Sequence, residues 1–195
     1  MSNTYTQIHI HAVFAVQNRE SLIQKSWRER LYQYIIAIMQ KHEHKVLSIG
    51  GMADHVHLFF GFRPTQSLSS LMQEVKRDSS EWINQNKFVL GRFSWQEGYG
   101  AFSYGKSQID DVVKYIHNQE KHHSKRTFTE EYKEILDRFG VEYDKRFVFH
   151  AVEEDASPRD APNGGIPFST KRGIPNGMPT EISSHRDVSK GDANE

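Results

Sequence analysis

Residues 45–62 read KVLSIGGMADHVHLFFGF, and this stretch decides the fold. Two runs rich in β-branched and aromatic residues, 45–51 and 55–62, are typical of short strands. The residues between them, Gly51 to Asp54, are of the kinds that favour a tight turn. The pattern therefore predicts a β-hairpin.

On the N-terminal side of the hairpin, the sequence predicts one strand and one helix. Residues 5–16 are rich in β-branched and aromatic side chains and keep the two-residue alternation of a strand. Residues 22–41 place apolar side chains at helical spacing and contain no Gly or Pro. Ser21 and Ser26 are both candidate caps for this helix.

On the C-terminal side, the sequence predicts a second helix, a further strand region and two more helices. Ser67 is the candidate cap of the second helix, and the strand region lies within residues 93–104. Ser107 is the candidate cap of the third helix, and Thr127 or Thr129 opens a fourth that reaches about residue 139. The order β-α-β-β-α-β predicts an α+β fold, a ferredoxin-like antiparallel sheet with helices on one face and additional C-terminal helices.

Composition divides the chain into two regions. With 36% hydrophobic and 26% charged residues, the chain has the profile of a folded globular protein. We expect one domain over residues 1–150. Most of the prolines fall in residues 151–195, which are acidic and poor in large apolar side chains, so we expect a disordered acidic tail there.

Charge and cysteine content restrict the partners. The net charge is zero, so any nucleic-acid site must depend on local clustering. No apolar run is long enough to cross a bilayer and no secretory signal is visible, so we expect a cytoplasmic protein with no membrane partner. Without cysteine, a metal has only His, Asp, Glu and Gln as ligands, which favours Mg²⁺ or Mn²⁺. We expect no organic cofactor.

Two histidine pairs are candidate metal ligands. His55 and His57 lie two apart on a predicted strand, so both imidazoles project from one sheet face. His9 and His11 have the same spacing on the first strand, and the residues alone do not decide between the pairs. Polar side chains at a strand end are the ordinary alternative. Asp54 serves either as a turn residue or as a support for the histidines.

A second candidate set lies on the third predicted helix. Tyr115 and Gln119 are four residues apart and therefore share a helix face. The amide oxygen of Gln119 could be a third metal ligand, and the Tyr115 hydroxyl could be a nucleophile beside it. A tyrosine at such a position is more often a packing residue. Arg63, Lys76 and Arg77 could contact DNA phosphates, although a solvated surface is the commoner role for each.

Three separated motifs resemble one family. They are Gly51 to Phe59, Trp95 to Ser103, and Tyr115 to Gln119 followed by His122 and His123. In this order they resemble the small single-tyrosine HUH transposases of the insertion-sequence 200/605 type. The resemblance covers about residues 1–140, and Tyr5, His11, Val13, Phe14 and Arg19 fit the family's first block. Gln17 departs from it, because the family usually carries a lysine near there.

The resemblance implies roles for the candidate residues. His55 and His57 correspond to the family's metal pair, Gln119 to the third ligand and Tyr115 to the nucleophile. His11 falls outside the metal pair, in a structural or DNA-contacting position. Lys114 and Lys121 are nearby basic groups that could contact the nucleic acid.

The resemblance also implies a reaction and partners. The reaction is cleavage and rejoining of single-stranded DNA with hairpin ends, through a 5′-phosphotyrosine. The assembly is a homodimer in which the tyrosine helix of one subunit completes the metal site of the other. The alternative is a catalytically silent or domesticated single-strand nucleic-acid-binding protein of the same fold. A two-histidine phosphoesterase fits less well, because its motifs carry Ser or Thr where His11 and His57 stand.

Overall fold

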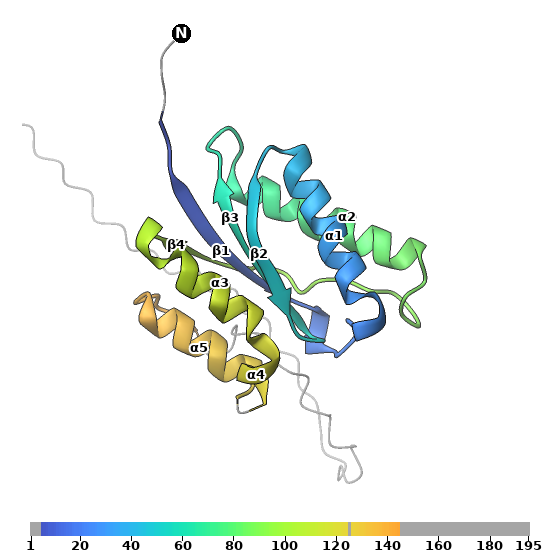
Figure 1. Cartoon of the computed structure of the whole chain (residues 1–195). Helices are drawn as coiled ribbons and strands as arrows, with labels where there is room; N and C mark the ends of the chain where they lie inside the picture. The colour runs from blue at the N-terminus through green and yellow to red at the C-terminus, as the bar shows by residue number, and fades with distance from the viewer. Residues whose placement is uncertain (1–4, 125, 145–195) are drawn as a thin grey trace, which may run out of the picture. The chain divides into compact units, whose positions relative to one another are not determined.

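The computed structural model describes residues 5–124 and 126–144, which form a four-stranded antiparallel sheet with helices on both faces (Figure 1). The strand order is β2-β3-β1-β4, the order of a ferredoxin-like sheet, so the predicted α+β class is confirmed. In chain order the main elements are β1 (Ile8–Ala15), α1 (Lys25–Lys41), β2 (Lys45–Gly51), β3 (His55–Phe62), α2 (Leu68–Gln85), β4 (Gly100–Tyr104), α3 (Ile109–His117), α4 (Gln119–His123) and α5 (Phe128–Arg138).

Helices α1 and α2 cover one face of the sheet and form the larger core with it (Figure 1). Alternate residues of β1, among them Ile10, Ala12 and Phe14, point into this core, where they meet Val56 and Leu58 of β3. Burial of these apolar side chains is the main driving force for folding. The functional consequence is that the intervening residues of β1 and β3 face the other side of the sheet.

Helices α3, α4 and α5 lie on that other side (Figure 1). Phe59 of β3 packs with Val112 and Ile116 of α3, while α5 packs over β1 and β4. Gly50 of β2 permits the close approach of α3, since a Cβ atom there would lie 2.8 Å from the backbone oxygen of Ile116. The three helices therefore form a second layer directly above the odd-numbered residues of β1 and β3.

Two of the predicted helix caps are confirmed and four candidates are wrong, among them Thr129, which lies inside α5. The side chains of Ser67 and Thr127 accept hydrogen bonds from the backbone amides of Ser70 and Glu130, as N-caps do. Helix α1 begins after Gln24, so neither Ser21 nor Ser26 is its N-cap. Ser107 lies inside a short 3₁₀ helix, and α3 begins after Gln108. At these two helix starts, tertiary packing overrides the general preference of serine for caps.

Other predictions agree with the structure only in part. Of the strand region predicted within residues 93–104, only Gly100–Tyr104 forms a strand, while Trp95 contributes an isolated bridge to Val16. The tail predicted at 151–195 lies outside the described residues. Among the helices described, none is long and apolar enough to cross a membrane.

Candidate metal and tyrosine site

His55 and His57 project from β3 into the layer beneath α3 and α5, and the side chains of both are fully buried. The Nδ1 atom of His55 lies 2.7 Å from Oδ1 of Asp54, while the other carboxylate oxygen accepts from Arg19 at 3.1 Å. Because an ionised carboxylate only accepts, His55 donates from Nδ1 and presents a lone pair at Nε2. Asp54 therefore supports the histidine as well as serving the turn.

His57 is held in a similar way by His11. Nδ1 of His57 lies 2.9 Å from Nε2 of His11, and the two rings are stacked. Nε2 of His57 is buried and has no hydrogen-bond partner among the described residues. His11 is itself 1% exposed, and its contact with Nδ1 places it to orient His57. His9, the other histidine of the second candidate pair, lies near the start of β1 beside Phe59.

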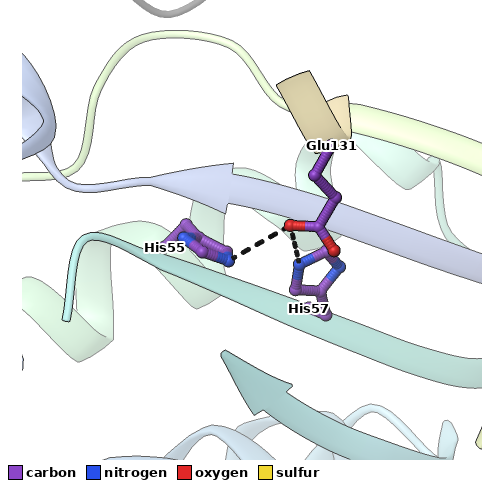
Figure 2. A group of neighbouring side chains, drawn as sticks. All are labelled: His55, His57 and Glu131. Carbon is purple, nitrogen blue, oxygen red and sulfur yellow. Dashed lines mark ion pairs between the residues drawn. The ribbon is translucent and has the colours of Figure 1, made fainter. Parts of the chain in front are cut away.

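Glu131 of α5 points between the two histidines, which Figure 2 shows. Its Oε2 atom lies 3.8 Å from Nε2 of His55 and 3.7 Å from Nε2 of His57. The ligand atoms of these three buried residues all lie within 4.8 Å of one another, so the group could hold a metal ion. Two imidazole nitrogens that face one carboxylate are ligands expected of a divalent-cation site.

Sequence reasoning missed Glu131. A signal was present, because Phe128, Tyr132 and Ile135 mark the buried face of the last helix and position 131 falls on that face. A glutamate on the apolar face of a helix is unusual unless it has partners. Its neighbour Glu130 serves the N-terminal cap of α5 instead.

Tyr115 and Gln119 meet the histidines at this carboxylate. The hydroxyl of Tyr115 and Nε2 of Gln119 both donate to Oε1 of Glu131, the latter at 2.7 Å. The Gln119 amide oxygen lies 3.4 Å from Nε2 of His55. Contrary to the prediction of one helix, α3 ends at His117 and α4 begins at Gln119, yet both side chains still point to the same place.

Burial and neighbouring charges set the protonation of the site. Burial lowers the pKa of His55 to about 4, and it lowers the pKa of His11 well below its ordinary value, so both imidazoles are neutral near pH 7. Burial on its own raises the pKa of Glu131, but His123 and His57 reverse this and bring it well below the usual range. Burial, together with Glu131, raises the pKa of Tyr115. The site therefore combines neutral imidazoles, an ionised carboxylate and a protonated phenol.

The predicted nucleic-acid contacts fall into two groups. Lys76 and Arg77 lie on α2, which covers the opposite face of the sheet, and Arg63 follows the end of β3. Lys76 donates to the backbone oxygens of Gln96 and Gly98, and Arg63 pairs with Glu43. These three residues therefore lie away from the metal candidates.

The second group is close to the site. Lys114 is exposed on α3, one residue before Tyr115. Lys121 is exposed on α4 and lines a hollow that Tyr115 also lines. Of the predicted basic residues, Lys121 is thus the one that shares a surface with the tyrosine.

Comparison with known proteins points to one family. Residues 4–119 match the family described as Transposase IS200 like. A protein of Deinococcus radiodurans R1 assigned as a transposase has a similar crystal structure, with 17% identity, coverage of 61% of this chain and 95% of that one, and a TM-score of 0.47. A REP-associated tyrosine transposase bound to a REP hairpin has 16% identity, coverage of 63% and 73%, and a TM-score of 0.49. No curated protein matches in sequence.

Proposed function

The chain belongs to the IS200-like transposases, and we propose that it cleaves and rejoins single-stranded DNA with a divalent metal and a tyrosine nucleophile. One observation carries the proposal. Tyr115 lies at the same carboxylate as His55 and His57, with its ring 5.9 Å from that of His57. Buried histidines beside a tyrosine hydroxyl are the two components that metal-assisted phosphoryl transfer to a phenol requires.

The metal would be held by the two imidazoles and two oxygens. The Nε2 atoms of His55 and His57 supply nitrogen, and Gln119 and Glu131 supply an amide and a carboxylate oxygen. Such a mixed set suits Mg²⁺ or Mn²⁺, with Mn²⁺ the better match to imidazole. When bound there, the cation supplies positive charge toward the oxygens of a scissile phosphate. Asp54 and His11 fix the two imidazoles from behind, at their Nδ1 atoms.

The covalent step is carried by Tyr115. Its oxygen forms a bond to phosphorus as the bond from phosphorus to the 3′ oxygen breaks, which leaves a 5′-phosphotyrosine and a 3′-hydroxyl. Attack by another 3′-hydroxyl reverses the step and joins new strands without an external energy source. Since burial raises the pKa of Tyr115, its hydroxyl is protonated in the free protein and must lose the proton as the new bond forms.

The test is covalent capture of DNA. Purified protein is incubated with Mn²⁺ or Mg²⁺ and hairpin-bearing single-stranded oligonucleotides taken from the DNA that flanks the gene. We expect a denaturant-resistant protein–DNA adduct that chelation of the metal abolishes. Tyr115→Phe should abolish it as well, whereas Tyr5→Phe, at a position 89% exposed, should not. An adduct that persists in Tyr115→Phe would refute the assignment, and metal-independent binding without cleavage would favour the non-catalytic alternative.

The arrangement of subunits has its own test. The homodimer with shared sites stays a prediction, and the contact of Tyr115 with Glu131 in one chain supports a site complete in cis. We propose mixing Tyr115→Phe protein with His57→Ala protein, each inactive alone. A site shared between subunits predicts recovery of a fraction of the activity in the mixture. A site complete within each chain predicts none.

A further inference from the structure

A hollow between α3 and α5 leads to the tyrosine, and it is called the α3–α5 groove below. It has a volume of about 730 Å³, within the range of roughly 300–1,000 Å³ found for pockets that hold a small-molecule ligand. Tyr104, Val112 and Ile135 give it apolar and aromatic surface, while Asp111 and Lys121 are among its polar residues. The cavity thus has the size and the mixed lining that a nucleotide requires.

The groove is continuous with the proposed catalytic site. Tyr115 and Glu131, which meet through a hydrogen bond, both line it. The side chains of His55, His57 and Gln119 lie behind them and are at most 2% exposed. When a scissile phosphate lies at Tyr115, the nucleotide next to that phosphate therefore lies in the groove.

The charges of the groove suit a phosphodiester at one end. Lys121, Arg126 and Arg138 are its lysine and arginine side chains, and Glu134 pairs with both arginines, at 3.6 Å for Arg138. Lys121 forms no ion pair with the residues that the structure describes, so its ammonium group is available to an anion. The groove also has three carboxylates, Asp111, Glu131 and Glu134. Glu134 is engaged by the arginines and Glu131 accepts from Tyr115, Gln119 and His123. Asp111 has no such partner among the described residues, so it is the carboxylate that most directly opposes an anion.

We propose that the α3–α5 groove binds a nucleotide next to the scissile phosphate of the single-stranded DNA substrate. The base lies against the apolar surface of Val112 and Ile135, and the backbone phosphate lies near Lys121 and Arg138. This inference rests on the proposed function, since the DNA is the substrate of that reaction. It adds a binding surface supplied by α5, a helix beyond the residues that match the family.

The experiment measures binding separately from cleavage. Every protein carries Tyr115→Phe and is assayed without metal, by fluorescence anisotropy of a labelled 20-nucleotide single strand of mixed sequence. Lys121→Gln combined with Arg138→Gln should weaken binding about tenfold. It should also reduce the slope of affinity against salt by about 0.7 for each phosphate that the protein no longer neutralises. Lys133→Gln, on α5 but outside the groove, is the matched control and should bind as the parent does.

A second pair of variants tests whether removal of a negative charge from the groove strengthens DNA binding. Asp111→Asn removes an anion from the groove and should tighten binding about threefold. Asp110→Asn removes the adjacent carboxylate of the same helical turn, which does not line the groove, and should change nothing. Equal effects of the two substitutions would overturn the proposal even if the loss of Arg138 disturbs α5. Tighter binding of RNA of the same sequence would overturn the assignment to DNA.

The two proposals fail in different ways. If the groove variants behave as expected and no covalent adduct ever forms, the transposase chemistry fails and the binding surface stands. If the adduct forms normally and Asp111→Asn binds like Asp110→Asn, the groove assignment fails alone.

Discussion

Replacement of Glu131 by alanine should clearly destabilise the metal-free protein. The side chain is 6% exposed and accepts from the Tyr115 hydroxyl, from Nε2 of Gln119 at 2.7 Å and from Nε2 of His123 at 2.7 Å. A buried donor left without a partner costs about 1–3 kcal/mol. Relief of the buried charge offsets part of the loss of three such bonds. We therefore expect a net loss of about 3 kcal/mol in the free energy of unfolding.

The assay is thermal unfolding followed by circular dichroism in the presence of a chelator. A loss of about 3 kcal/mol corresponds to a fall in melting temperature of roughly 10 °C for a domain of this size. Glu131→Gln keeps an amide oxygen as acceptor and gains an amide donor, so the free energy of unfolding should fall by only about 1 kcal/mol. Glu134→Ala is the control on the same helix, because its carboxylate is half exposed and a surface ion pair contributes about 0–1 kcal/mol. Equal melting temperatures for Glu131→Ala and Glu134→Ala would refute the reasoning.

Two further predictions concern the histidines and the approach of α3. Burial lowers the pKa of His55 from 6.5 to about 4. Between pH 6.5 and pH 4 the imidazole is therefore protonated in the unfolded chain and neutral in the folded chain. Stability of the metal-free protein should therefore fall by up to about 3 kcal/mol as pH drops from 6.5 toward 4, and denaturant unfolding at several pH values measures it. Constant stability over this range would contradict it. Gly50→Ala places a Cβ 2.8 Å from the Ile116 backbone oxygen, so unfolding experiments should show a loss of about 1–3 kcal/mol. A variant as stable as the parent would show that α3 can shift without cost.

The fold could be predicted because its signals are local. Alternation in residues 5–16, the hairpin around Gly51 and the apolar spacing of the helices each depend on neighbours in the chain. Their order then restricts the topology, and the observed strand order agrees with it. The predicted caps of α1 and α3 are wrong because neither helix start has a side-chain cap: Gln24 and Gln108 stand at the N-cap positions without a capping hydrogen bond, so a nearby serine does not mark the start.

The site could be predicted only where its residues are close in sequence. The two-residue spacing of His55 and His57 indicates a shared face, and the structure places them on one. That His11 lies behind His57, while His9 does not, depends on the register between β1 and β3. Glu131 is 74 residues beyond His57, so its place beside the histidines follows from the packing of α5 on the sheet and from no local pattern.

Glu131 connects the stability of the free protein with its proposed chemistry. In the free chain its carboxylate is occupied by the Tyr115 hydroxyl and by Gln119, and these contacts hold α3, α4 and α5 together over the histidines. The reaction requires the same hydroxyl to turn to a phosphorus atom and the same oxygens to face a cation. Each interaction that stabilises the closed layer must therefore be exchanged for one to metal or DNA. A substitution of Glu131 should therefore reduce both the packing of α3, α4 and α5 over the sheet and the affinity for the metal, because one carboxylate contributes to both.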